Sequence, residues 1–212
     1  MMTFTGLVKN GGVFVVKGKD GSEKQLISFT AVDALGNTFS CQMWPDDQQH
    51  AQLLQLIGSL RRQRIQFEIA GYTVRMRQFK DGNKQPQINF IVTNVTQPDP
   101  KQPASASGLF FSGTVKTGNV FDLNTKNGPS KLISLTAIDE LGNAWPCQMW
   151  PDDPQHAQLV PVIASARRQA VGFEVVSYAL RMRKFQDGRP DQPQVNFTVS
   201  RVSLPGLNVQ VA

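Results

Sequence analysis

The sequence is poor in several features that would define a protein class at once. Only 2 of its 212 residues are cysteine and only 2 are histidine. Cys41 and Cys147 occupy the same position in two repeated segments, so neither has a partner within its own segment and we expect no disulfide framework. No apolar run approaches the ~18 residues of a membrane-spanning helix, and the N-terminus lacks the order of a signal peptide. We therefore expect a cytoplasmic protein without a membrane partner.

Motifs of catalysis and of metal binding are also missing. The sequence contains neither a G-x-G-x-x-G run nor a Walker-type loop. Each histidine, His50 or His156, follows two aspartates at the expected start of a helix, where polar residues cap the backbone and compensate the helix dipole. No nucleophile, base and orienting group recur together. We expect a non-enzymatic protein that holds no metal ion and no cofactor.

A duplication is the main feature that the sequence does have. Aligning Leu26–Gly82 with Leu132–Gly188 gives identity at roughly 35 of 57 positions, far above the level of unrelated segments. The period of about 106 residues is the size of a whole domain and exceeds that of solenoid repeats. We predict domains over residues 1–97 and 109–205, a linker over 98–108 that is rich in Pro, Ser and Ala, and a C-terminal tail over 206–212.

The order of predicted elements indicates the fold class. In the first repeat, Gly6–Gly18 and Leu26–Trp44 predict three strands, residues 46–63 predict a helix, and Arg64–Phe79 with Pro86–Val95 predict a hairpin. This order is typical of the OB-fold, a five-stranded Greek-key barrel. The predicted class is all-β with one helix per domain, as two tandem OB-fold barrels. An SH3-like barrel is the alternative, but it would lack a helix of this length at that place.

The second repeat has the same order of elements with one change in its helix. Pro161 replaces Gln55 inside the predicted helical segment. A proline in a helix interior removes a backbone hydrogen bond and clashes with the preceding turn. We therefore expect the second helix to be bent or shortened.

Charge and strand alternation suggest a binding surface. The formal net charge is +6, with roughly +4 on the first repeat and +2 on the second, which favours a polyanionic partner. Phe39, Cys41 and Met43 alternate with Ser40, Gln42 and Trp44, so the first set is predicted to be core and Trp44 to face water. On the next strand the arginines of the R-M-R run share a face with one aromatic residue. Guanidinium groups can contact phosphates or bases, and an aromatic ring can stack on bases of any sequence.

These patterns give a set of candidate nucleic-acid-binding residues in each repeat. They combine exposed aromatics, arginines, amides on the neighbouring strand and basic residues in the hairpin loops. Alternatives remain for each type: a Trp can cap the barrel against the helix, and charges or amides can be ordinary surface. The candidates are Trp44, Arg75, Arg77, Phe79, Lys80, Lys84, Gln87 and Asn89 in the first repeat, and Trp150, Arg181, Arg183, Phe185, Arg189, Gln194 and Asn196 in the second.

The segment Asn37–Val95 resembles the bacterial single-stranded DNA-binding protein family. The shared features are a strand that ends in an aromatic, a short helix, and a hairpin with an R-x-R-x-aromatic run before an Asp-Gly turn, over about 60 residues of each repeat. The resemblance places Trp44 and Phe79, with their second-repeat counterparts, at stacking positions of the family. It implies single-strand binding by stacking and phosphate contact. It also implies a homodimer, because tandem forms pair to gather four OB-folds.

Two differences from the family pattern modify this expectation. The first strand, MTFTGLVKNGGVF, does not resemble the family's usual opening, and the sequence ends in GLNVQVA without an acidic tail. We therefore expect a phage, plasmid or specialised replication or recombination protein rather than a housekeeping one. Our prediction is a sequence-tolerant binder of single-stranded DNA, with RNA as a further ligand. The alternative is an OB-fold module that binds protein, in which Trp44, Trp150 and the arginines are interface anchors.

Overall fold

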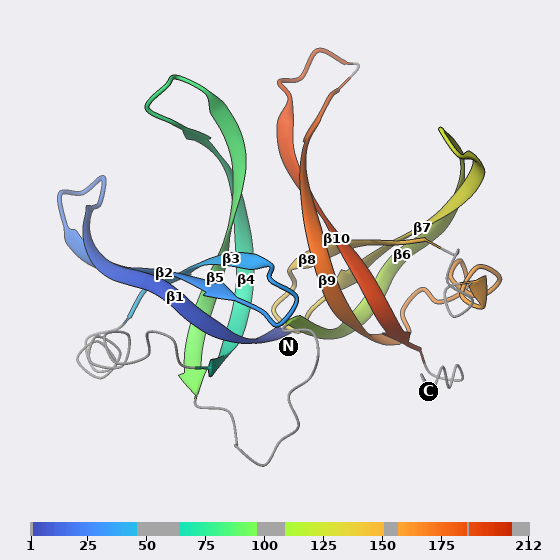
Figure 1. Ribbon diagram of the computed structural model, residues 1–212, viewed down its shortest axis with the longest axis horizontal. Coiled ribbons are helices and arrows are strands. Elements are labelled where there is room, and N and C mark those ends of the chain that lie inside the picture. Colours follow the sequence, from blue (N-terminus) through green and yellow to red (C-terminus); the bar gives the residue numbers. More distant parts are fainter. Residues whose placement is uncertain (1, 46–63, 97–108, 151–156, 186, 205–212) are drawn as a thin grey trace. The chain divides into compact units, whose positions relative to one another are not determined.

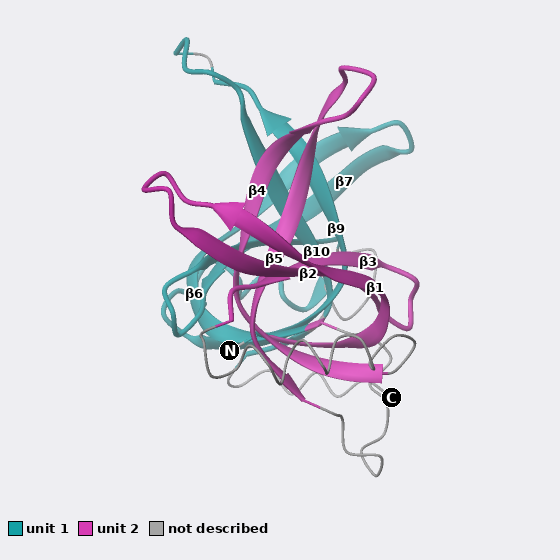
Figure 2. Cartoon of the chain, turned by 90° about the vertical axis from the view of Figure 1, so that its left-hand side faces the viewer, with its two compact units in different colours: residues 1–2, 110–212 teal, residues 3–109 magenta. Residues whose placement is uncertain are grey.

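The structure is a computed structural model that describes residues 2–45, 64–96, 109–150, 157–185 and 187–204 (Figure 1). The chain separates into two compact units, residues 3–109 and residues 110–212 together with residues 1–2 (Figure 2). The predicted linker, the predicted C-terminal tail and the first predicted helix lie outside the described residues.

Five strands of the first unit form a closed barrel. They are β1 (Met2–Lys17), β2 (Glu23–Val32), β3 (Thr38–Met43), β4 (Arg64–Gln78) and β5 (Lys84–Thr96). Their order around the barrel is β1-β2-β3-β5-β4, and β4 returns to β1. The β1–β2, β2–β3 and β4–β5 pairs are antiparallel, whereas β3 and β5 run parallel. This is the predicted OB-fold, in which the connection between β3 and β4 allows β5 to insert between them.

The second unit repeats this barrel. Its strands are β6 (Leu109–Thr125), β7 (Gly128–Ile138), β8 (Ala144–Met149), β9 (Ala170–Arg183) and β10 (Gln192–Ser203). Their order is β6-β7-β8-β10-β9, and β9 pairs with β6 to close the barrel. The β8–β10 pair is parallel, as its counterpart is in the first unit.

Strand alternation fills each barrel with aromatic side chains. Phe39, Cys41 and Met43 are buried, as predicted, and the ring centroids of Phe4 and Phe39 lie 4.5 Å apart. In the second barrel the rings of Phe111 and Phe173 stack at 4.5 Å. Large apolar rings that pack together in a closed barrel give each unit a core of its own.

The segment before β9 differs from a regular helix. In residues 157–168 most backbone bonds join a residue to the third one before it, such as Val160 N–H to the Ala157 carbonyl and Ser165 N–H to the Val162 carbonyl. Only Ile163 N–H reaches back four residues, to the Leu159 carbonyl. The expected distortion is therefore present over these residues, because Pro161 has no N–H to donate. Leu159 and Ile163 are buried, so the turns still cover the barrel.

Candidate nucleic-acid interface

Two hairpin arms extend from each barrel beyond the ends of its central strand. In the first unit the β2–β3 pairing ends at Ile27 and Met43, the last residue of β3. The β2 residues before Ile27 pair only with β1, and together they form the β1–β2 arm. β5 begins before Phe90, which pairs with Cys41, so the β4–β5 arm extends past the opposite end of β3. Both arms rise on the same side of the barrel (Figure 1). The outer surface of β3 therefore lies between the two arms.

The β4–β5 arm brings arginines and amides onto one face. Arg75 pairs with Gln87 and Arg77 pairs with Gln85, and side chains directly opposite each other share a face. The Arg77 Nη1 group donates a hydrogen bond of 3.4 Å to Gln87 Oε1, and Gln87 Nε2 donates one of 3.5 Å to Ser40 Oγ on β3. The predicted alignment of Arg75, Arg77 and Gln87 is present. These groups form a polar row that reaches from β4 across β5 to β3.

The predicted aromatic of this arm stands next to the arginine row. Phe79 is 41% exposed, and the Arg77 Cζ atom lies 5.3 Å from its ring centroid. A guanidinium at this distance from a ring forms a cation–π contact. Lys80 and Lys84 are exposed at the arm's tip, and Asn89 is partly buried opposite Thr73. The arm thus offers a flat ring and several positive charges to a ligand.

The corresponding arm of the second barrel covers its ring more fully. Phe185 is only partly exposed, because Arg183 Cζ lies 5.0 Å and Arg189 Cζ lies 4.3 Å from its centroid. Arg189 also pairs with Asp187 at 2.8 Å, and its hydrogen bonds hold the pKa of that carboxyl below its usual range. Arg181 pairs with Gln194, whose amide donates a 3.4 Å hydrogen bond to Asn196 Oδ1. The protein's own guanidinium groups therefore already cover part of the Phe185 ring.

Two of the three tryptophans, Trp44 and Trp150, face water at another part of the surface. Trp44 is 50% exposed and Trp150 is 38% exposed, each directly after the last residue of β3 or β8. Gln42 pairs with Ile91 in the parallel β3–β5 pair, so Trp44, two residues later, is level with Thr93 of β5. Arg77 pairs with Gln85, which lies eight residues before Thr93. At ~3.3 Å per residue, Trp44 therefore lies about 25 Å along the sheet from Arg77. The structure therefore places Trp44 and Phe79 near opposite ends of one surface and not in one cluster.

Sequence reasoning missed one further aromatic in each repeat. Phe14 on β1 and Phe121 on β6 are exposed and pair with the equivalent residues Leu26 and Leu132. The signal was a Gly-x-Val-Phe run that occurs in both repeats. The stretch from this run to the next strand is one residue shorter in the second repeat, so an alignment at a constant offset does not match the two runs. The barrel part of the same strands also carries an exposed lysine. Lys9 and Lys116 occupy the same position, at the bulge of β1 and of β6.

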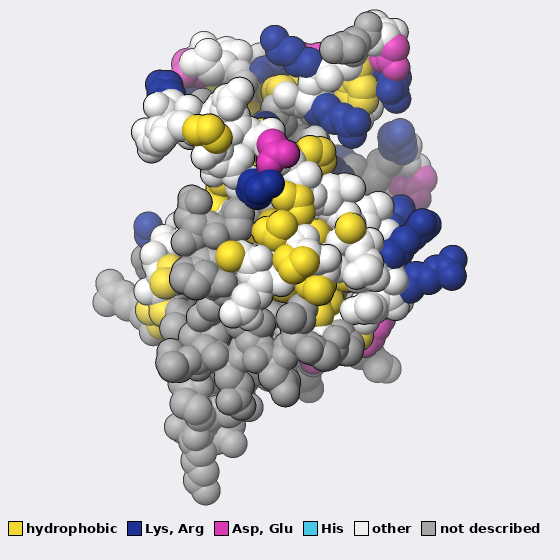
Figure 3. Space-filling model, turned by 90° about the vertical axis from the view of Figure 1, so that its right-hand side faces the viewer, with side chains coloured by type: hydrophobic (Ala, Val, Ile, Leu, Met, Phe, Trp, Pro, Cys, Tyr) yellow, Lys and Arg dark blue, Asp and Glu magenta, His cyan; other side chains and the backbone are white. Residues whose placement is uncertain are grey.

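Basic side chains predominate over acidic ones on these arms. Figure 3 shows Lys and Arg side chains over the upper part and along one edge of the face in view, with hydrophobic side chains mostly on the body below. In the second repeat the exposed basic residues include Arg181, Arg183, Lys184 and Arg189. Such a distribution attracts a polyanion, and salt weakens the attraction.

The described part of the chain shows no group of three or more His, Cys, Asp or Glu side chains that could hold a metal ion. Asp46, Asp47 and His50, at the start of the predicted helix, and their second-repeat counterparts lie outside the described residues. Within the same ranges no helix is long and apolar enough to cross a membrane. Cys41 and Cys147 are buried free thiols, and burial raises the pKa of both.

Comparisons with known proteins give structural neighbours but no family. No protein-family model matches the chain, and no curated protein matches it. Among solved structures, it is similar to a deletion mutant of the single-stranded DNA-binding protein from Thermus aquaticus, with a TM-score of 0.48, 13% identity, and coverage of 99% of this chain and 95% of that one.

Two further neighbours are also described by their binding to DNA. A replication protein A heterotrimer bound to single-stranded DNA has a TM-score of 0.30 and 9% identity, over 97% of this chain and 49% of that one. A murine DNA-binding protein bound with double-stranded DNA has a TM-score of 0.30 and 10% identity, over 96% of this chain and 98% of that one.

Proposed function

We propose that this chain binds single-stranded DNA without strong sequence preference and without catalysing a reaction. The observation that supports this most is the arginine and aromatic arm, because it occurs in both barrels at the same register. Arg77 stands beside exposed Phe79, and Arg183 stands beside Phe185. Rings left at the surface beside guanidinium groups suit a ligand with flat apolar faces and negative charge, which describes an unpaired polynucleotide. A duplex hides the faces of its bases, so it is the poorer ligand.

Each group has its own role in the proposed complex. Arg75 and Arg77, with Arg181 and Arg183, neutralise phosphates, while the amides of Gln87 and Asn89, with those of Gln194 and Asn196, hydrogen-bond to base edges or phosphates. Trp44 and Phe79, with Trp150 and Phe185, stack on bases. Lys80, Lys84 and Arg189 contact the backbone from the arm tips. Because every base has a π-face, stacking of this kind tolerates any sequence.

The proposal extends to assembly and biological role. The family resemblance suggests a homodimer that gathers four OB-folds, in a cytoplasmic protein of DNA replication, recombination or repair. RNA that lacks secondary structure presents the same bases and phosphates, so we include it as a weaker candidate ligand. A pair of titrations with oligo-dT and oligo-U distinguishes the two, since their backbones differ at the 2′-hydroxyl group.

The test is a titration with oligo-dT at several salt concentrations. Trp44 and Trp150 are exposed whereas Trp145 is buried, so stacking is expected to quench part of the tryptophan fluorescence. The logarithm of the binding constant is expected to fall linearly with the logarithm of the salt concentration, because phosphate contacts release counterions. The Arg75→Ala variant with Arg181→Ala should reduce the salt slope by about 0.7 for each phosphate that is no longer neutralised.

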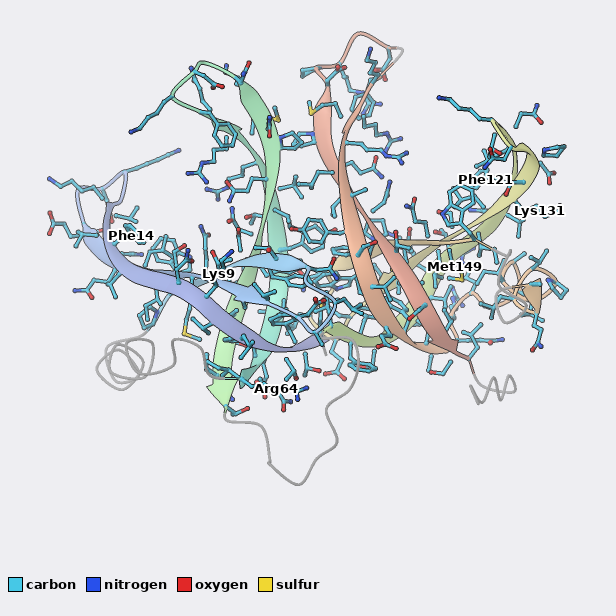
Figure 4. The ribbon with its side chains drawn as sticks, viewed as in Figure 1. Lys9, Phe14, Arg64, Phe121, Lys131 and Met149 are labelled. Carbon is cyan, nitrogen blue, oxygen red and sulfur yellow. The ribbon has the colours of Figure 1, made fainter. Side chains whose placement is uncertain are left out.

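Arg64→Ala is the matched control for the arginine variants. It removes a positive charge from the same strand as Arg75, but Arg64 lies at the start of β4, away from the arm (Figure 4). Its salt slope should match that of the unmodified protein. Absence of quenching and of salt dependence in the unmodified protein would contradict DNA binding and favour the protein-binding alternative. Equal slopes for all three proteins would show that Arg75 and Arg181 contact no phosphate.

A further inference from the structure

Each repeat has an exposed aromatic that the interface described above does not use. Phe14 is 55% exposed on β1 and Phe121 is 48% exposed on β6. Figure 4 shows each on the strand that leads into the arm of its barrel, the β1–β2 arm or the β6–β7 arm. A single exposed ring is common on protein surfaces. Two rings at the same register position of two repeats, both beside a leucine on the next strand, need an explanation.

Strand register shows which way the first ring faces. Val13 pairs with Ile27, and Ile27 pairs with Met43. Because Ile27 and Met43 are fully buried, this row faces the barrel interior, and the next row along the strands faces outward. That outer row contains Phe14 and Leu26, which pair directly, followed by Trp44 immediately after β3. Phe14 therefore shares the outer face with Trp44.

The second barrel repeats this arrangement. Val120 pairs with Ile133, and Ile133 pairs with Met149, both of which are buried. The outer row then consists of Phe121 and Leu132, which pair directly, and Trp150 immediately after β8. In each barrel two rings stand two strand spacings apart, about 9–10 Å, with a partly buried leucine between them.

The two arms differ on the face opposite the rings. Phe14 is followed by the exposed Val15, whereas Phe121 is followed by Asp122, which pairs with Lys131 at 2.7 Å. At this position the opposite face carries an exposed valine in one copy and an ion pair in the other, and in the first copy the Lys17–Glu23 ion pair lies further along it, so it provides no common surface for an apolar partner. The outer face has the ring in both copies.

The charges near the outer row favour a nucleic-acid ligand over a protein. In both barrels an exposed lysine, Lys9 or Lys116, lies at an equivalent bulge of β1 or β6, five residues and about 17 Å before the ring on the same strand. In the first barrel Lys24 pairs with Val16 on the same face as Phe14. A narrow row of two rings and one leucine, with Lys24 on the same face in the first barrel and a lysine further along the strand in both, matches bases and their phosphates, whereas a protein interface would call for a wider apolar patch.

From this we infer that Phe14 and Phe121 are an additional base-stacking position in each barrel, so that a bound strand continues past the tryptophan onto the arm. The inference rests on the proposed single-strand binding and extends it to a surface on the other side of β3 from the arginine arm. Each barrel then contacts the strand from Phe79 or Phe185 at one end to Phe14 or Phe121 at the other.

The first experiment compares three variants in the full chain by oligo-dT titration. Phe14→Thr with Phe121→Thr removes both rings and is expected to weaken binding by on the order of tenfold. Phe14→Tyr with Phe121→Tyr keeps flat rings and should bind within about twofold of the unmodified protein. Val15→Thr is the matched control, because Val15 is an exposed residue of the same strand on the opposite face, and it should leave affinity unchanged.

The second experiment identifies the contact directly in the unmodified protein. Oligo-dT that carries 5-iodouracil is irradiated in complex with the chain, and the cross-linked peptides are mapped by mass spectrometry. Cross-links are expected in the peptides that contain Phe14 and Phe121. This readout does not depend on whether the threonine variant folds.

The outcomes separate this inference from the proposed function. If the unmodified protein binds no oligonucleotide, both fail. If it binds, but the threonine variant binds equally well and neither peptide cross-links, the additional stacking position is wrong and single-strand binding stands. A threonine variant with unchanged DNA affinity and a changed mass in light scattering would assign the rings to a protein contact and would also overturn the inference.

Discussion

At the scale of single residues, the two barrels use different side chains at equivalent core positions. Phe39 of the first barrel corresponds to Trp145 of the second, and both are fully buried. The Trp145 indole N–H donates a 3.0 Å hydrogen bond to Asp139 Oδ2. Burial by itself would raise the pKa of Asp139, but the hydrogen bonds from Asn143, Trp145 and the backbone hold that pKa below its usual range. The larger ring is thus accommodated because its polar atom has a buried partner.

The two cysteines are expected to be unreactive while the protein is folded. Cys41 and Cys147 are fully buried, and burial raises the pKa of each thiol, so the nucleophilic thiolate is scarce near neutral pH. A thiol-reactive dye should label neither at pH 8 under native conditions and both in denaturant. Rapid labelling of the native protein would contradict the burial of these side chains.

At the scale of elements, a bulge in β4 decides which side chains form the arginine face. Ile69 pairs with Val92 and Gly71 pairs with Ile91, so β4 has one extra residue at this point. Before the bulge the odd-numbered residues of β4 face the core, and after it the even-numbered residues do. After the bulge Tyr72 pairs with the buried Phe90. Arg75 therefore faces outward although it has the same parity as the buried Ile69. β9 has an equivalent irregularity opposite Val199.

Gly118 shows how closely the turn segment before β9 approaches its barrel. A Cβ atom on Gly118 would lie 2.4 Å from the Ile163 carbonyl oxygen, a contact that the backbone must relieve by moving. We expect Gly118→Ala to lower the free energy of unfolding by about 1–3 kcal/mol. Urea denaturation followed by fluorescence measures the change.

Gly12→Ala is the control for this substitution. A Cβ atom at Gly12, also in a first strand, would meet only the Phe14 ring at an ordinary 3.5 Å. Its free energy of unfolding should change by less than about 1 kcal/mol. A Gly118 variant as stable as the Gly12 variant would mean that the turn segment does not press on β6.

At the scale of the whole molecule, the duplication gives two related but unequal surfaces. The first repeat has the larger net positive charge, and its arm leaves Phe79 more exposed than Phe185. In the second repeat Arg189 lies over the ring and is paired with Asp187. A base that stacks on Phe185 must share or displace that guanidinium group. We therefore expect the first barrel to bind single strands more tightly.

Disabling one barrel at a time tests this inequality. Arg75→Ala with Arg77→Ala should cost more affinity for oligo-dT than Arg181→Ala with Arg183→Ala, although each pair removes two positive charges. If both barrels contact one strand, each pair should weaken binding to a long oligonucleotide by about 100-fold or more, because linked sites reinforce each other. Anisotropy titrations measure both losses. Equal losses would contradict the inequality, and a small loss on the long strand would mean that the barrels bind independently.

The sequence by itself determined the duplication, the strand order, the OB-fold and the inward face of β3. These follow from local patterns, namely repeat identity, period-two alternation and turn residues, which act over a few neighbouring positions. Only the tertiary structure decided how the predicted residues are distributed. Pairing of β3 with β5 separates Trp44 from Phe79, and the pairing of β1 with β2 aligns Phe14 with Leu26 in the row that leads to Trp44. Such relations depend on which strands become neighbours and on where bulges shift their register, and both are set by packing between segments distant in the sequence.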